Sequence, residues 1–80
     1  MNTKQAVANR ILQICSKKEI TINALANICG VNPSTIYSML NNKSKNPGIV
    51  TIKKICDGFG ITLGEFFNTN EFDSLEQEII

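Results

Sequence analysis

The stretch that most constrains this chain is residues 21–42, which reads as two short helices joined by a tight turn. Thr21 can cap the first helix, because its hydroxyl can accept from the backbone N–H groups that the first turn leaves unpaired. Gly30 ends that helix at little steric cost, since the terminating residue commonly adopts a left-handed conformation. Asn32 and Pro33 start the second helix, with an asparagine cap and a proline at the first helical position, where its missing N–H is not needed.

The apolar residues of this stretch indicate which face of the helix pair is buried. Helices of this length are not stable alone, so the two must bury a shared face. The apolar positions, which repeat at helical spacing, are Leu25, Cys29, Val31, Ile36, Met39 and Leu40. The second helix then directs outward a stripe of mostly hydrogen-bonding side chains, namely Pro33, Ser34, Tyr37, Ser38 and Asn41. Such a stripe suits a helix in the major groove of DNA, because donors, acceptors and methyl contacts read the base edges.

A specific order of apolar, small and glycine positions runs through the pair: Leu25-Ala26, Cys29-Gly30-Val31, Ile36 and Met39. This order resembles the Cro/cI repressor-like (XRE-type) helix–turn–helix family. The resemblance implies an all-α, five-helix, lambda-repressor-like DNA-binding domain with the helix–turn–helix at helices 2 and 3. It also implies that the helix from Pro33 to about Asn41 is the recognition helix. The alternative is an ordinary helical hairpin whose polar stripe is only solvated.

Apolar spacing and capping signals predict three further helices. Residues 3–17 form the first, with apolar side chains on one face and polar ones opposite. Residues 49–59 repeat the apolar pattern and end at Gly60, a second glycine C-cap. Thr62 and Glu65 spell a capping box that starts a fifth, short helix. We expect these helices to form the scaffold that holds the helix pair.

The last residues, 69–80, form an acidic amphipathic tail that we separate from a DNA-binding domain of residues 1–68. Ser74 and Gln77 offer another capping box, so the tail allows an extra short C-terminal helix. The apolar face of that helix would consist of Phe72, Leu75 and Ile79. Such a tail can fold back on its own domain, cover a partner subunit or stay partly disordered.

Two positions depart from the pattern of the family that the chain resembles. Relatives often carry an Arg at the position of Cys15 and a Glu at that of Leu40, which form a partly buried ion pair. Here both residues are apolar. Joint replacement of a buried pair is tolerated, whereas loss of one partner leaves a charge uncompensated. The departure therefore predicts a contact between Cys15 and Leu40.

The net charge of +1 is low for a protein that binds a polyanion, but the charges are unevenly distributed. Residues 1–54 carry all eight basic side chains and one acid, hence +7. Residues 55–80 carry six acids and no base, hence −6. A domain polarised in this way can present a positive face to phosphates. Lys43 and Lys45 lie in the loop directly after the expected recognition helix, where relatives contact the DNA backbone.

Composition argues against several other classes of protein. The three cysteines, Cys15, Cys29 and Cys56, show no CxxC spacing and the chain has no histidine, which excludes the usual zinc sites and a Cys–His catalytic pair. We interpret them as small buried hydrophobes in a reduced compartment, with a redox sensor as the alternative. No run is apolar enough for a membrane span and the N-terminus lacks a signal-peptide core. We therefore expect a cytoplasmic protein without a cofactor or an enzymatic activity.

These patterns predict a sequence-specific transcriptional regulator that binds a double-stranded DNA operator, as a homodimer on two half-sites. The residues expected to contact bases are Ser34, Thr35, Tyr37 and Ser38. The residues expected to contact phosphates are Asn41, Lys43, Lys45 and Asn46. The alternative function is an antitoxin-like or other protein-interaction module, which uses the same fold and holds a protein partner through residues 69–80.

Overall fold

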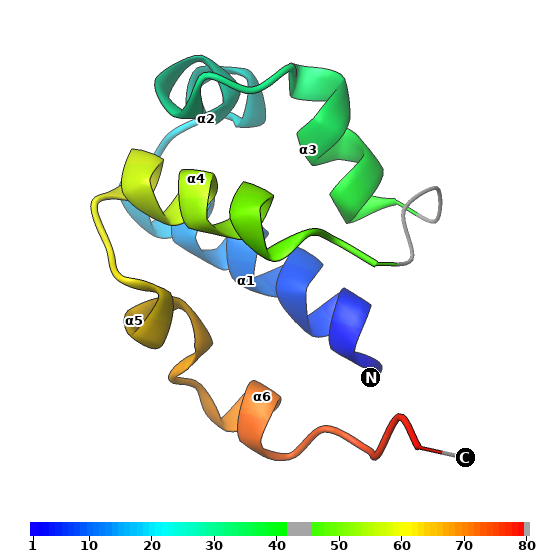
Figure 1. The fold of residues 1–80 in the computed structure, drawn as a ribbon. Helices are drawn as coiled ribbons and strands as arrows, with labels where there is room; N and C mark the ends of the chain where they lie inside the picture. Colours follow the sequence, from blue (N-terminus) through cyan, green and yellow to red (C-terminus); the bar gives the residue numbers. More distant parts are fainter. Residues whose placement is uncertain (42–45, 80) are drawn as a thin grey trace.

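The computed structural model describes residues 1–41 and 46–79, and its regular elements in these ranges are α-helices (Figure 1). Along the described chain these helices are α1 (Thr3–Lys18), α2 (Ile22–Cys29), α3 (Pro33–Leu40), α4 (Ile49–Phe59), α5 (Leu63–Phe67) and α6 (Asn70–Asp73). The all-α class predicted from the sequence is therefore confirmed for these residues.

Helix α1 lies at the centre of the arrangement. In Figure 1 it runs behind α4, with α2 and α3 on one side of it and α5 and α6 on the other. Helices α3 and α6 pack against α1, α2 packs on α3 and α4, and α5 packs on α4. The buried side chains of α1 are Ala6, Val7, Ala8, Ile11, Ile14 and Cys15. Most of them join buried residues of α2, α3, α4 and α5 in one core, so α1 connects the α2–α3 pair to the C-terminal half.

The ends of the helix pair have the predicted caps. The Thr21 hydroxyl accepts a backbone N–H of the first turn of α2 at 3.1 Å, and Gly30 ends that helix with a φ of 70°. The Asn32 side-chain oxygen accepts the Ser34 N–H at 2.9 Å, and Pro33 is the first residue of α3. These local signals therefore fix where each helix of the pair begins and where the turn lies.

The two departures from the family pattern are both accommodated by apolar packing. Cys15 is buried in the core, and Leu40, the last residue of α3, is half-buried against the same cluster. Among the described residues no charged side chain is buried and no buried side-chain nitrogen or oxygen lacks a hydrogen-bond partner. The interior thus holds no charge that a lost ion pair would have left uncompensated.

The tail differs from the prediction in where its helix begins. Helix α6 starts after Thr69, whose hydroxyl accepts the Phe72 N–H at 3.3 Å. Ser74 ends this helix instead of starting one, and residues 75–79 are not helical. The predicted capping box of Ser74 and Gln77 is therefore wrong, as is a helical face that includes Ile79.

Aromatic packing explains why the helix of the tail forms earlier. The Phe72 ring lies against Phe66 and Phe67, with centroid distances of 6.1 and 4.9 Å. Phe66 and Phe67 themselves meet edge to face at 4.9 Å, and Phe66 is fully buried. The burial of aromatic surface favours the turn that brings Phe72 onto this cluster, and Thr69 is placed to cap that turn.

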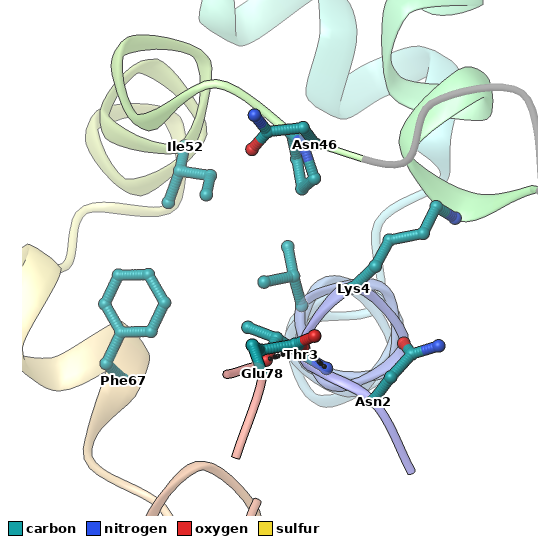
Figure 2. Close-up of a pocket in the computed structure, with 9 residues that line it drawn as sticks. Asn2, Thr3, Lys4, Asn46, Ile52, Phe67 and Glu78 are labelled. Carbon is teal, nitrogen blue, oxygen red and sulfur yellow. Dashed lines mark hydrogen bonds between the residues drawn. The ribbon is translucent and has the colours of Figure 1, made fainter. Parts of the chain in front are cut away.

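The end of the tail is bonded to the start of α1. Glu78 Oε2 accepts the Thr3 hydroxyl at 2.6 Å and the Thr3 backbone N–H at 3.4 Å (Figure 2). The bond from the hydroxyl, and then the bond from the N–H, hold the pKa of the Glu78 carboxyl below its ordinary value. A carboxylate at this place also suits the positive end of the α1 dipole. The described part of the tail therefore folds back on its own domain.

Helices α2 and α4 approach each other closely at Gly58. A methyl group added at Gly58 would lie 2.5 Å from Cys29 Sγ and 3.4 Å from Ile28 Cγ2. A glycine inside a helix is unfavourable compared with alanine by about 1 kcal/mol. The close contact with Cys29 gives a packing reason for a glycine at this position.

We expect Gly58→Ala to lower the free energy of unfolding by about 1 kcal/mol, because overpacking by about 1–3 kcal/mol exceeds the helix propensity that alanine gains. In a Cys29→Ala background the same change should instead raise this free energy by up to about 1 kcal/mol, since the sulfur atom is gone. Urea unfolding of the single and double variants measures the difference. Equal effects of Gly58→Ala in both backgrounds would contradict the packing explanation.

Candidate nucleic-acid interface

Helix α3 separates an apolar face from a polar one. Ile36 and Met39 are buried in the core, which fixes the rotation of the helix about its axis. Ser34, Thr35 and Tyr37 are exposed on the other side, and Tyr37 keeps 47% of its surface accessible. The predicted outward direction is therefore found for Ser34 and Tyr37, and Thr35, which lies outside the predicted stripe, is exposed as well.

The two serines of α3 have local hydrogen-bond partners. The Ser38 hydroxyl, which is half-buried, donates to the backbone carbonyl of Ser34 at 2.9 Å. The Ser34 hydroxyl donates to the Asn32 side-chain oxygen at 2.9 Å. A hydroxyl has one proton and two lone pairs, so each serine oxygen can still accept a hydrogen bond. In this state the two serines suit donors such as the amino groups of adenine and cytosine.

The four candidate phosphate contacts are only partly described. Asn41 and Asn46 are both exposed, and they flank residues 42–45, which lie outside the described residues. Lys43 and Lys45 lie outside the described residues. The structure thus places the two ends of the predicted phosphate-contacting segment at the surface, with Asn41 directly after the last residue of α3.

Two basic residues are bonded to other residues of the same chain. Arg10 donates from Nε to the Phe66 carbonyl at 2.7 Å and from Nη2 to the Glu65 carbonyl at 2.8 Å. These carbonyls belong to the C-terminal part of α5, where a cation is favourable. Lys53 forms an exposed ion pair with Asp57 one turn later. Counting charges along the sequence therefore overstated how many of them point towards a polyanion.

A third basic residue, Lys4, contacts the main chain at the end of α3. The ammonium group of Lys4 donates to the backbone carbonyl of Met39 at 3.1 Å and to that of Asn41. Sequence reasoning missed this residue, because main-chain carbonyls carry no side-chain signal and the partners lie more than 30 positions away. Lys4 is therefore placed against the end of α3 by the fold alone.

A cleft of about 590 Å³ lies beside the start of α1. Its walls come from the start of α1, from the segment before α4 and from α4, α5 and the tail, with Val7, Pro47, Ile52 and Phe67 as the apolar part. Figure 2 shows Ile52 and Phe67 facing this space and the Thr3–Glu78 contact at its edge. Lys4 and Asn46 also line the cleft, but no residue of α3 does, so we do not assign the cleft to base recognition.

The cysteines belong to the packing of the core. Cys15 and Cys56 are buried and Cys29 is half-buried. Burial raises the pKa of all three thiols, which disfavours the reactive thiolate.

Within the described residues no group of three or more Cys, Asp or Glu side chains is arranged to hold a metal ion. None of the helices in residues 1–41 and 46–79 is long and apolar enough to cross a membrane.

A capped helix that is held by a buried face, and that follows another helix across a glycine turn, has the geometry of a helix–turn–helix motif. A sequence model of the Cro/C1-type HTH DNA-binding domain matches residues 10–71, and the chain belongs to this family. It is thus a DNA-binding domain of the Cro/C1 regulator type.

The fold is also similar to a solved structure, described as the crystal structure of the prophage Lp1 protein 11. The two chains share 32% sequence identity with a TM-score of 0.82, and the match covers 94% of this chain and 100% of the other. No curated protein sequence matches the chain.

Asn32 offers a test of how α3 is held at its start. We expect Asn32→Ala to lower the free energy of unfolding by about 1 kcal/mol, because the Ser34 N–H loses its capping acceptor. Asn32→Ser is the matched control, because a serine hydroxyl also accepts at an N-cap and caps a helix about as well as asparagine does. Denaturant unfolding followed by circular dichroism compares the two. An equal loss in both variants would show that the cap does not stabilise α3.

Proposed function

We propose that this protein regulates transcription by binding double-stranded DNA at specific sequences, with α3 in the major groove. The observation that supports this most directly is the polar face of α3, which is turned outward because Ile36 and Met39 are buried. Hydroxyl groups and an aromatic ring on that face can contact base edges and thymine methyl groups. The proposed base-contacting residues remain Ser34, Thr35, Tyr37 and Ser38.

The proposed backbone contacts come from the segment after α3. Asn41 and Asn46 are exposed at its two ends, and Lys43 and Lys45 lie between them in the sequence. Contacts to phosphates fix the register and orientation of a protein on the duplex without reading the sequence. We therefore assign these four residues to positioning and the α3 residues to base recognition.

A homodimer on DNA is part of the proposal. A single eight-residue helix contacts few base pairs, so one copy gives little specificity across a genome. Proteins of this docking type reach higher specificity with two copies on half-sites about 34 Å apart. The operator is then expected to have two-fold symmetry.

A protein-interaction module that holds a partner through residues 69–80 has weaker support. Phe72, the aromatic residue of that segment, packs on Phe66 and Phe67 of its own chain. Glu78 is bonded to Thr3. Ile79, which is 87% exposed, is the apolar residue of the described tail that most favours this second candidate.

The proposal is tested by selecting bound sites from random duplex DNA and measuring the mass of the resulting complex. We expect a palindromic site bound by two chains. Recovery of no preferred sequence, even at low ionic strength, would contradict sequence-specific binding. A single chain on an asymmetric site would contradict the dimer.

Two substitutions should separate positioning from base recognition on the selected site. We expect Lys45→Ala to weaken binding to all duplexes alike and to reduce the slope of log affinity against log salt by about 0.9, because one phosphate contact is lost. We expect Tyr37→Phe to change base preference at one or two positions of the site by about tenfold and to leave the slope unchanged. Quantitative binding titrations at several salt concentrations measure both.

Lys17→Ala is the matched control for the loss of a lysine. Lys17 is an exposed residue in the last turn of α1, whereas the first turn of α1 is the one that meets the end of α3. It should leave both the salt slope and the base preference unchanged. If Lys45→Ala and Tyr37→Phe behave like this control, α3 and the segment after it do not bind the DNA.

A further inference from the structure

Helix α3 ends differently from its neighbours in the fold. Helices α2 and α4 end at Gly30 and Gly60, whose φ angles of 70° and 75° turn the backbone so that its N–H groups bond to carbonyls of the last turn. Helix α3 instead ends at Asn41 in an extended conformation, with φ −108° and ψ −170°. The chain thus leaves α3 without a left-handed turn, so carbonyls at this end need donors from elsewhere.

Lys4 supplies such a donor from another helix. Its ammonium group bonds to the carbonyl oxygens of Met39 and Asn41, one on each side of the last residue of α3. In Figure 2 the Lys4 side chain extends from α1 towards the end of α3. A cation near helix C-terminal carbonyls is favourable, and here no basic residue of α3 itself lies in its last turn. We call these two bonds the Lys4 clamp.

The first turn of α1, which carries Lys4, is itself held in place. Asn2 and Gln5 form a reciprocal capping box, with distances of 2.8 Å and 3.0 Å. Thr3 is bonded to Glu78 of the tail. The ammonium group therefore reaches α3 from an anchored helix end instead of a free terminus.

We propose that Lys4 is a positioning residue for DNA recognition, which fixes the last turn of α3 and the point where the chain enters the proposed phosphate-contacting segment. This inference rests on the proposed function. It also concerns a residue outside positions 10–71, so the family match does not include it. Lys4 is proposed to act through α3, because two of the three donors of its ammonium group are bonded to main-chain carbonyls.

The test on DNA uses Lys4→Met, which keeps an apolar side chain of similar length but removes the donor. We expect affinity for the selected operator to fall about tenfold, as loss of a hydrogen bond from a charged group implies. Affinity for a scrambled duplex should fall less, so the preference for the operator decreases. The salt slope should stay unchanged, because no phosphate contact is lost. Lys4→Arg should restore affinity and preference, since its guanidinium also donates to carbonyls.

Lys17→Met is the control for loss of a lysine from the same helix. It should bind like the wild type. A fall of about 0.9 in the salt slope for Lys4→Met, with the preference unchanged, would overturn the proposal and make Lys4 a phosphate contact. Wild-type affinity and preference in Lys4→Met would also overturn it. All titrations are made well below the unfolding temperature of each variant, so a loss of global stability does not change the preference.

A measurement without DNA separates this inference from the proposed function. We expect amide hydrogen exchange of Leu40 and Asn41 to become about tenfold faster in Lys4→Met, while the amides at the end of α2 keep their rates. Unchanged exchange at Leu40 and Asn41 overturns the clamp, whatever the protein binds. If the wild type binds no DNA, the proposed function fails and the role of Lys4 in recognition fails with it, whereas faster exchange would still establish the clamp itself.

Discussion

The burial of Ile36 and Met39 is the interaction on which the functional surface depends. An eight-residue helix does not persist alone in water, so α3 exists because its apolar side is packed against α1 and α2. Each such side chain contributes about 1.5–3 kcal/mol when fully buried. The same contact decides which residues are turned outward, since a helix fixed by one face has no freedom to rotate. The burial of Ile36 and Met39 therefore stabilises α3 and also determines which of its side chains face outward.

Helix α1 has a second role besides filling the core, because it provides cations to the ends of two other helices. Arg10 bonds to the carbonyls at the end of α5, and Lys4 bonds to those at the end of α3. The resemblance to the family implies an ion pair between α1 and α3 at the positions of Cys15 and Leu40. Both are apolar here and pack in or against the core. Among the described residues, Lys4 provides a polar connection from α1 to the main chain at the end of α3.

Most of the fold could be predicted because the signals that start and end its helices are local in the sequence. The caps at Thr21, Gly30 and Asn32 involve residues within a few positions of one another, and each appears as expected. The tail could not be predicted in the same way, because Thr69 and Ser74 are both competent N-caps. Packing of Phe72 on a distant pair of rings decides between them. For the candidate site, the outward face of α3 followed from helical spacing, whereas the Lys4 clamp depends on contacts that only the folded chain creates.

The bond between Thr3 and Glu78 joins residues 75 positions apart, and it brings the two ends of the described chain together. Adjacent ends are the geometry that tolerates circular permutation. A linker of a few residues would close the chain into a ring, and it could then be cut at a surface turn such as the one between α4 and α5. The order of the helices along the polypeptide would change, while the turn between α2 and α3 would keep its connectivity.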